Sequence, residues 1–164
     1  MTTSLAPTTR LDVKKLAPHM SKAMNALDAA SRETDLEPAL LELVRTRASQ
    51  LNGCAFCVDL HSRDARTGGE HERRLYALAV WREAPFFTPR ERTALALTEA
   101  ATRLTDGPVA DDVFDAAAAE FGDVGLAELL FTITVINAWN RLGATARPWP
   151  LSLRDGDVSN GESA

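Results

Sequence analysis

Two cysteines and a histidine share a short segment of this sequence at spacings that suit redox chemistry. Cys54 and Cys57 lie three residues apart, and His61 follows Cys57 by four residues. On a helix that begins near Cys54, the three side chains fall within roughly 60° of one face. Adjacent helical turns bring two cysteine Cα atoms within about 6 Å, which allows a disulfide. The spacing therefore predicts a redox-active dithiol with a histidine beside it.

The expected start of this helix also favours a reactive sulfur. Asn52-Gly53 is a stop signal for the preceding helix, because glycine takes the left-handed conformation that ends a helix. Free backbone N–H groups and the helix dipole stabilise an anion at the start of the next helix. Since the thiolate is the nucleophilic form of cysteine, the segment supplies an activated thiol, a resolving thiol and a base.

Other uses of these residues stay open when only the spacing is considered. Cys54, Cys57 and His61 could supply three of the four ligands of a zinc site, or the cysteines could only pack in the core. The sequence has no second cysteine pair, and His19 and His71 have no partner at ligand spacing. We therefore expect no metal site and no cofactor.

Composition is that of one ordinary globular domain. The chain has 164 residues, of which 45% are hydrophobic and 25% charged, and its net charge is −5. Nucleic-acid binders usually carry a basic excess, so this class is disfavoured. No secretory signal and no apolar stretch long enough to cross a bilayer is visible. Two close cysteines are too few for a secreted disulfide scaffold, and we expect a cytoplasmic protein without membrane partners.

The hydrophobic pattern predicts an all-α fold, a single-domain bundle of about seven helices. The expected helices cover about 17–31, 38–52, 54–67, 70–81, 88–104, 110–121 and 125–144. The fifth has the clearest start, because Thr88-Pro89-Arg90-Glu91 matches a capping box with proline in the first turn. We divide the chain into an N-terminal arm (1–15), a helical domain (16–150) and a polar tail (151–164).

The sequence around the cysteines resembles the alkylhydroperoxidase D-like proteins of the carboxymuconolactone decarboxylase superfamily. The resemblance rests first on Glu42, twelve residues before Cys54, followed by the CxxC pair and His61. Further stretches that resemble the family core are 42–45, 49–54, 61–65, 74–78, 81–83 and 136–142. The similarity spans about Leu16 to Ala146 and implies an all-α fold and a peroxidase cycle.

The resemblance implies a role for each site residue. Cys57 matches the cysteine that attacks a small hydroperoxide and becomes a sulfenic acid. Cys54 matches the resolving cysteine, which also exchanges with an external dithiol reductant such as a lipoylated protein. His61 and Glu42 match the proton relay. The chain departs from the founding peroxidase at Phe56, where that protein carries a histidine, so we expect a more apolar pocket.

Two other functions fit the same cysteine pair. One is a non-enzymatic redox sensor, in which the disulfide only changes the shape of the protein. The other is a general thiol–disulfide oxidoreductase without peroxide activity. Glu42 also has a simpler interpretation, an ion pair with Arg45 three residues along on an exposed helix face.

Large aromatic residues near the expected helix ends predict a homo-oligomer. A chain of this length cannot cover all of its apolar faces by itself, and uncovered apolar patches usually mark interfaces. The resemblance favours a trimer or a hexamer. The aromatic residues concerned are Phe86, Phe87, Trp139 and Trp149.

Overall fold

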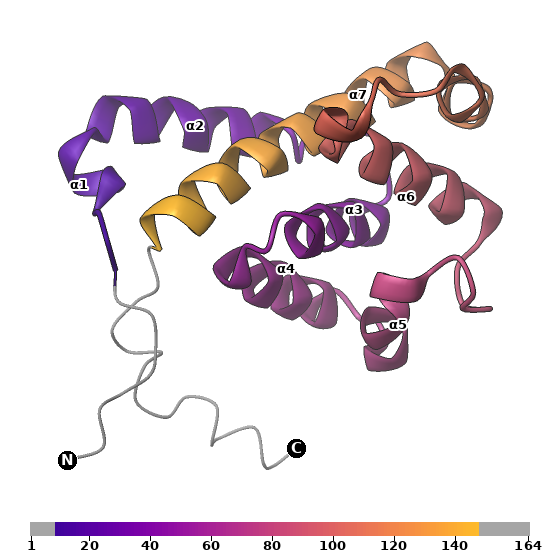
Figure 1. The fold of residues 1–164 in the computed structure, drawn as a ribbon, viewed down its shortest axis with the longest axis horizontal. Coiled ribbons are helices and arrows are strands. Elements are labelled where there is room, and N and C mark those ends of the chain that lie inside the picture. The colour runs from indigo at the N-terminus through magenta and orange to yellow at the C-terminus, as the bar shows by residue number, and fades with distance from the viewer. Residues whose placement is uncertain (1–8, 148–164) are drawn as a thin grey trace.

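The structure is a computed structural model that describes residues 9–147 of the chain. This part is all-α, with seven α-helices, two short 3-10 helices and no β-strand (Figure 1). In chain order the elements are α1 Val13–Leu16, α2 Pro18–Ala30, α3 Pro38–Leu51, α4 Ala55–Thr67, α5 Glu72–Ala77, η1 Leu78–Val80, α6 Pro89–Thr102, η2 Leu104–Asp106 and α7 Asp111–Ala146. The predicted fold class is confirmed.

Helix α3 lies at the centre of the bundle and packs against α4, α6 and α7 (Figure 1). Nine of its 14 residues are buried, more than a single apolar stripe of a surface helix would account for. Those nine include the charged residues Glu42 and Arg45. Because α3 is enclosed by three helices, its polar side chains have to find partners within the protein.

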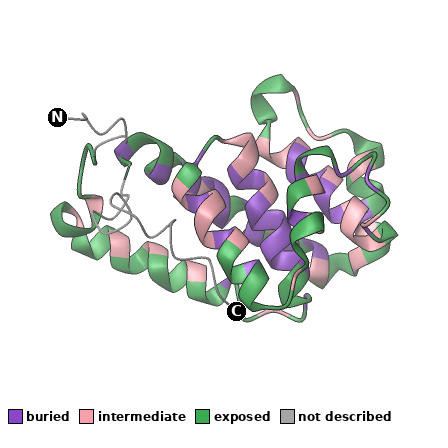
Figure 2. Ribbon diagram, turned by 90° about the horizontal axis from the view of Figure 1, so that it is seen from below, coloured by how far each residue is buried: buried purple, intermediate pink, exposed green. Residues whose placement is uncertain are grey.

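Two groups of buried apolar side chains hold the helices around α3, and Figure 2 shows buried residues concentrated in the central helices. The first group joins α3 to α6 and α7, and the second joins α3 to α4, α5, η1 and α6. Prominent members of the first are Leu40, Val44, Leu97, Leu129 and Ile133. Prominent members of the second are Leu43, Leu78, Trp81, Phe87 and Leu95.

The turn between α3 and α4 forms where the sequence predicted a stop. Gly53 has a φ of 64°, in the left-handed region that residues with a side chain rarely adopt. The N–H of Asn52 still donates to the carbonyl of Ala48, and the N–H of Cys54 donates to the carbonyl of Ser49. Gly53 thus reverses the chain and places Cys54 at the start of the next helix.

Helix boundaries differ from the expected ones mainly near the two ends of the described segment. Two helices were expected over 110–121 and 125–144. The structure has one element, α7, interrupted only at Gly122, whose φ of 65° and ψ of 175° are not helical. The expected break is confirmed, but the helix resumes directly after it. The short helix α1 was not predicted, and the helix expected over 70–81 is divided into α5 and η1.

The capping box predicted at Thr88 is confirmed. Its Oγ1 accepts from the N–H of Glu91, and the Glu91 carboxylate accepts from the N–H of Thr88. Within residues 9–147, none of the helices combines the length and apolarity needed to span a membrane. The predicted polar tail at 151–164 lies outside the described residues, and the division into arm, domain and tail stays a prediction.

The conformation of Gly53 makes it a test of how the α3–α4 turn is held. Replacing Gly53 with alanine should lower the free energy of unfolding by roughly 1–2 kcal/mol, the cost of a left-handed residue that carries a Cβ. An added Cβ meets no atom within 4 Å at this position, so the loss would come from backbone strain. The change in the free energy of unfolding is measured by urea unfolding followed by circular dichroism.

Gly68 is the matched control, because it ends α4 with an ordinary φ of −75°. Gly68→Ala should change the free energy of unfolding by no more than about 1 kcal/mol, in the stabilising direction. Equal losses for Gly53→Ala and Gly68→Ala would contradict the role given to the left-handed turn.

Candidate active site

Cys54 is the N-terminal cap of α4. Its backbone is extended, with φ −86° and ψ 92°, and its Sγ accepts a hydrogen bond from the N–H of Cys57 at 3.4 Å. This N–H is one of the donors that a helix start leaves without a backbone partner. A sulfur anion at this position would be stabilised by the N–H group and by the helix dipole.

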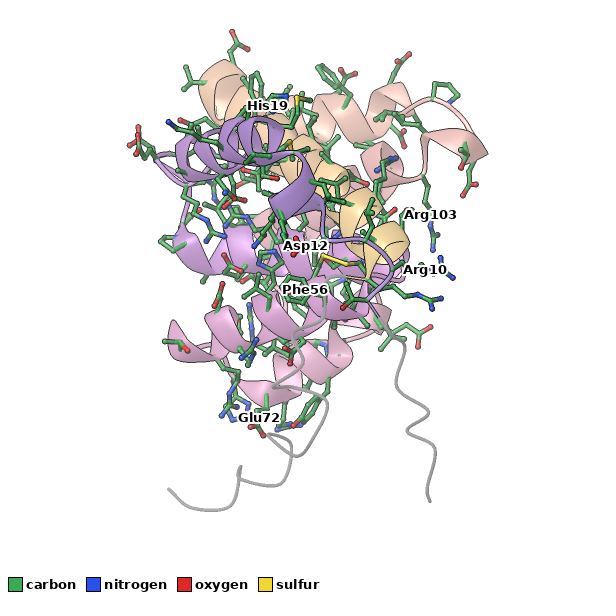
Figure 3. All side chains as sticks on the ribbon, turned by 90° about the vertical axis from the view of Figure 1, so that its left-hand side faces the viewer. Arg10, Asp12, His19, Phe56, Glu72 and Arg103 are labelled. Carbon is green, nitrogen blue, oxygen red and sulfur yellow. A yellow bond between two sulfur atoms is a disulfide. The ribbon has the colours of Figure 1, made fainter. Side chains whose placement is uncertain are left out.

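The two cysteines are joined in a disulfide, with their Cα atoms 5.3 Å apart. The side chains are almost inaccessible, because Cys54 is 1% exposed and Cys57 is 4% exposed. In Figure 3 the disulfide is the bond drawn in yellow near the C-terminal end of α7. The sulfurs lie in a small apolar cluster whose other members are Ala48, Ile136, Phe56 and Trp139.

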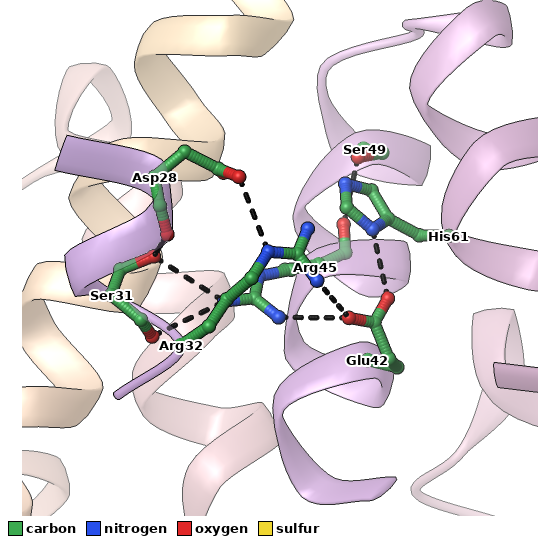
Figure 4. A network of polar contacts seen from close by, with 7 residues as sticks. All are labelled: Asp28, Ser31, Arg32, Glu42, Arg45, Ser49 and His61. Carbon is green, nitrogen blue, oxygen red and sulfur yellow. Dashed lines mark hydrogen bonds and ion pairs between the residues drawn. The ribbon is translucent and has the colours of Figure 1, made fainter. Parts of the chain in front are cut away.

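His61 lies on α4, one helical turn beyond Cys57, and it is also buried. Its Nδ1 lies 2.8 Å from Oε2 of Glu42, which comes from α3 (Figure 4). The structure therefore brings Glu42 and His61, 19 residues apart in sequence, into direct contact. The site then combines a disulfide-bonded cysteine pair, an imidazole and a carboxylate on two adjacent helices.

Glu42 also binds arginine side chains through its other carboxylate oxygen, Oε1. Nη1 of Arg45 lies 2.8 Å from this oxygen, and Nη1 of Arg32 lies 3.3 Å from it (Figure 4). The pair of Glu42 with Arg45 that the simpler interpretation predicted is present. Its predicted exposure is wrong, because the two side chains are only 11% and 3% exposed. The same carboxylate thus serves the ion pair and the histidine.

The surroundings of Glu42 keep it ionised. Burial raises its pKa, but the hydrogen bond to His61 and the charges of His61 and Arg45 outweigh burial and lower the pKa below its usual value. An ionised Glu42 accepts a hydrogen bond from Nδ1–H of His61. In neutral imidazole the lone pair is then on Nε2, so the carboxylate holds His61 in the tautomer that can take up a proton there.

Several residues of this network were not identified from the sequence. Nη2 of Arg45 lies 3.3 Å from both the carbonyl oxygen and Oγ of Ser31, at the end of α2. Arg32 pairs with Asp28 on one side and Glu42 on the other. The contacts join segments 10 and 14 residues apart across a turn, so no helical spacing signals them.

A second polar chain links the end of α3 to α7. Asn140 donates from Nδ2 to Oγ of Ser49 at 3.0 Å, and Ser49 donates to the carbonyl of Arg45 at 2.7 Å. Asn52 donates from Nδ2 to the side-chain oxygens of Asn137 and Asn140, both at 2.9 Å. These bonds fix the α3–α4 turn, and with it Cys54, against α7.

The residues that could hold a metal ion differ from those considered in the sequence. A disulfide leaves Cys54 and Cys57 without thiolates, so the cysteines as they stand do not fit a zinc site. Glu42, His61 and Asp64 each bring one ligand atom, and these atoms lie within 4.8 Å of one another. Asp64 is exposed and lies three residues after His61, so its place on the same face was predictable. The arginines on Glu42 already balance its charge, which disfavours a cation there.

Histidines and aromatics outside the site have structural positions. His19 and His71 are exposed, and Nδ1 of His71 accepts from the N–H of Arg73 at the start of α5. Phe87 is buried and Phe86 half-buried in the cluster around Trp81. Trp149 lies outside the described residues.

Comparison with known proteins identifies the family of the chain. Residues 18–100 match the carboxymuconolactone decarboxylase family. The chain is 35% identical to the uncharacterized protein YdfG of Bacillus subtilis over 133 residues, which are 81% of this chain and 90% of YdfG. It is 37% identical to the uncharacterized protein YnjA of Escherichia coli over 108 residues, which are 65% of this chain and 58% of YnjA.

Solved structures show the same fold. ATU0492 from Agrobacterium tumefaciens superposes with a TM-score of 0.84 at 35% identity, covering 87% of this chain and 97% of that one. That protein, of unknown function, is described as a candidate antioxidant defence protein AhpD. An uncharacterized peroxidase-related protein from Silicibacter sp. TM1040 gives a TM-score of 0.72 at 20% identity, over 88% of this chain and 74% of that one. Fold, CxxC pair and family match together show that this chain belongs to the carboxymuconolactone decarboxylase family, as an alkylhydroperoxidase D-like protein.

Proposed function

We propose that this protein is a thiol-dependent peroxidase that reduces small hydroperoxides through the Cys54–Cys57 pair. The observation that carries the proposal is the buried disulfide at the start of α4, one helical turn from the bonded pair His61 and Glu42. The disulfide is the oxidised state that such a cycle produces. The description of ATU0492 as a candidate antioxidant protein supports the same class of chemistry.

The proposed cycle uses one cysteine for each step. The thiolate of Cys57 attacks the distal oxygen of the hydroperoxide, which leaves an alcohol and a sulfenic acid on Cys57. The thiolate of Cys54 then attacks the Cys57 sulfur and releases water, which forms the disulfide. An external dithiol attacks the disulfide and restores both thiols while becoming a disulfide itself. One hydroperoxide is reduced for each dithiol oxidised.

His61 and Glu42 would move the protons that this cycle requires. Nε2 of His61 can accept the proton of the Cys57 thiol and later return it to the leaving oxygen or sulfur. The ionised Glu42 stabilises the imidazolium that forms in between, since their hydrogen-bonded atoms are 2.8 Å apart. Cys54 has separate support, because the N–H of Cys57 donates to its sulfur and would favour the thiolate in the resolving step.

The burial of the sulfurs favours a small oxidant over a protein substrate. Cys54 and Cys57 are 1% and 4% exposed, so a folded protein disulfide cannot approach either sulfur without a rearrangement. A small hydroperoxide needs a far narrower path. This favours a peroxidase over the general thiol–disulfide oxidoreductase. A redox sensor would be oxidised by peroxide in the same way but would not turn over with a dithiol donor. The experiment below measures that turnover.

Single cysteine variants should separate the two roles. Cys57→Ser should abolish peroxide consumption in the presence of dithiol donors, including dihydrolipoamide and a lipoylated protein. Cys54→Ser should retain one attack and accumulate a sulfenic acid on Cys57, which dimedone labels and mass spectrometry locates.

Three results would contradict this scheme. Dimedone on Cys54 in the Cys57→Ser protein, with none on Cys57 in the other variant, would reverse the cysteine roles. Oxidation of the wild-type thiols by peroxide without turnover on any donor would favour the redox sensor. Faster reaction with protein disulfides than with peroxide would favour the oxidoreductase.

Removing the charge of Glu42 should slow the reaction of Cys57 with peroxide. Glu42→Gln should reduce this rate at neutral pH by about 10²–10⁴-fold, because the amide cannot stabilise the imidazolium. It should also cost about 3–5 kcal/mol of stability, since it leaves Arg45 buried without its partner. Stopped-flow measurement of thiol loss, on samples shown to be folded by circular dichroism, gives the rate.

Glu99 offers the matched control. It is a buried glutamate on α6 that binds Arg47, Arg82 and Trp81 but no histidine, and its pKa is also below the usual value because hydrogen bonds from these partners outweigh burial. Glu99→Gln should lose stability without slowing peroxide reduction. If the Glu42→Gln and wild-type proteins reacted with peroxide at equal rates, Glu42 would have only a structural role.

The stability cost of Glu42→Gln should also depend on pH in a defined direction. The folded protein lowers the pKa of Glu42 below its ordinary value of 4.5. Its stabilising contribution is therefore complete above pH 4.5 and is lost as the pH falls through the lower folded value. The difference in unfolding free energy between the two proteins should narrow in acid.

We further propose that the chain forms a homo-oligomer, as a trimer or hexamer, through α1 and α2. The aromatic residues behind the original expectation give little support, because Phe87 is buried in its own chain and Phe86 and Trp139 are half-buried. Helix α2 supports it instead, since none of its residues is buried. Within the described chain α2 touches mainly α1 and α7, and a helix this short is marginal in water without further packing.

The exposed apolar side chains of α1 and α2 identify the surface to test. Leu16 is 66% exposed, Met20 60% and Leu27 42%. Light scattering behind a sizing column should give a multiple of the 17.8 kDa chain mass, and Leu27→Glu should lower it. Tyr76→Glu, on an exposed residue of α5, should leave the mass unchanged. A monomer at micromolar concentration with full activity would exclude a role for assembly.

A further inference from the structure

Gly143 brings the backbone of α7 directly against the disulfide. A Cβ built on Gly143 would lie 2.6 Å from Sγ of Cys54 and 3.2 Å from Sγ of Cys57. Ordinary van der Waals contacts of a Cβ fall between 3.4 and 4 Å, so the sulfur of Cys54 leaves no room for a side chain here and the sulfur of Cys57 leaves less than an ordinary contact needs. Both sulfurs of the disulfide therefore lie close to the backbone of one residue of a helix distant in sequence.

The backbone conformation of Gly143 does not itself require glycine. The glycines with positive φ among the described residues are Gly53, Gly69, Gly107 and Gly122. Gly143 lies inside α7 with helical angles, where alanine has the higher helix propensity. What glycine provides at this position is space for the two sulfurs.

Helix α7 is held in place on both sides of Gly143. Asn140, one turn before it, bonds to Ser49 and Asn52 of the α3–α4 region. The carbonyl of Ala146, just after it, accepts from the N–H groups of Arg10 and Leu11 at 2.9 and 3.3 Å. A side chain at position 143 could therefore be accommodated only if the sulfurs moved, because both flanks of the helix are tied down.

The two redox states differ in how freely the sulfurs can move. Each thiol of the dithiol can rotate about its Cα–Cβ bond to another rotamer. In the disulfide each sulfur is bonded to the other, so neither can turn away alone. A Cβ at position 143 would consequently disfavour the disulfide more than the dithiol.

We propose that Gly143 is a positioning residue that sets the reduction potential of the Cys54–Cys57 pair. Its missing side chain stabilises the oxidised state relative to the dithiol. The equilibrium concerned is the loss of two protons and two electrons from two thiols as one S–S bond forms, with an external disulfide as acceptor. The inference rests on the proposed function only for its role in turnover, since the potential belongs to the disulfide itself.

Redox titration of Gly143→Ala tests this directly. The full-length protein is equilibrated with mixtures of reduced and oxidised dithiothreitol, and the disulfide fraction is measured by thiol alkylation and mass spectrometry. The equilibrium constant for disulfide formation should fall at least tenfold, a shift of about 30 mV for a two-electron couple. Gly125→Ala is the control, because a Cβ there would contact Phe121 and Leu36 and no sulfur. It should shift the constant less than twofold. The proposal would be overturned if the equilibrium constant for disulfide formation in Gly143→Ala were within twofold of the wild-type value or higher than the wild-type value.

A double-mutant comparison tests the contact on which the proposal rests even if Gly143→Ala is too unstable for redox titration. Thermal unfolding is measured for Cys54→Ala alone and together with Gly143→Ala. Removing the sulfur at 2.6 Å should relieve most of the clash, so alanine at 143 should cost much less stability in the Cys54→Ala background. Equal losses in both backgrounds, or a double variant that is also unfolded, would refute the contact. Neither readout uses peroxide, so failure of the peroxidase proposal would leave this test intact.

Discussion

Glu42 and Arg45 carry opposite charges on a helix that the fold encloses with α4, α6 and α7. Taking each charge out of water costs several kcal/mol, and this cost is offset only where the partner geometry is good and the remaining polar atoms are bonded. The structure meets this condition by giving one carboxylate oxygen to the arginines and the other to His61. Because the carboxylate is fixed by Arg45, it in turn fixes the imidazole ring one helical turn from Cys57. The stability of the central helix and the orientation of the base thus depend on the same carboxylate.

A second buried ion pair on α3 is also stabilised by good partner geometry, but it includes no residue of the candidate site. Arg47 leaves α3 toward α6 and pairs with Glu99, whose oxygens also accept hydrogen bonds from Trp81 and Arg82. Burial raises the pKa of Glu99, but the hydrogen bonds from these donors outweigh burial and lower the pKa below its usual value, so both buried glutamates are ionised for the same physical reason. Only Glu42 faces a histidine, and only that histidine lies on the helix of the cysteines. Both buried glutamates of this comparison are paired with arginines. The candidate site differs from the Glu99 cluster in having an imidazole and two sulfurs as well.

The two sulfurs lie in an almost inaccessible and largely apolar setting. The cysteines lie between α3, α4 and α7, in contact with apolar side chains and with the backbone of Gly143. In a low-dielectric environment a thiolate depends on the few donors and charges aimed at it. The N–H of Cys57 is such a donor for Cys54, and His61 is the base that we propose for Cys57. The polar bonds of Asn52 and Asn140 keep α7 against this region, so α7 also limits how far the sulfurs can move.

Local features of this protein could be predicted from the sequence because they depend on neighbouring residues. Gly53 predicted the turn because glycine readily adopts the left-handed conformation that ends a helix, and the capping residues at Thr88 predicted the start of α6. The spacing of Cys54 and Cys57 predicted their pairing, because the geometry of one helical turn sets the distance between them. Apolar periodicity predicted most helices but missed α1 and misjudged where the last helix resumes after Gly122. Helix ends depend on packing as well as on propensity.

Contacts between helices were decided only by the tertiary structure. The family resemblance implied that His61 and Glu42 share a proton relay, but their direct bond was shown only by the structure, since nothing in their spacing of 19 residues indicates it. The burial of Arg45, its bond to Ser31 and the contact of Gly143 with both sulfurs have no local signature at all. Each depends on how two helices pack, and packing is set by the sum of many apolar contacts along the whole chain. The sequence by itself determined which side chains could do redox chemistry, and the packing of α3, α4 and α7 decided which of them meet, in which charge state, and how closely the backbone confines them.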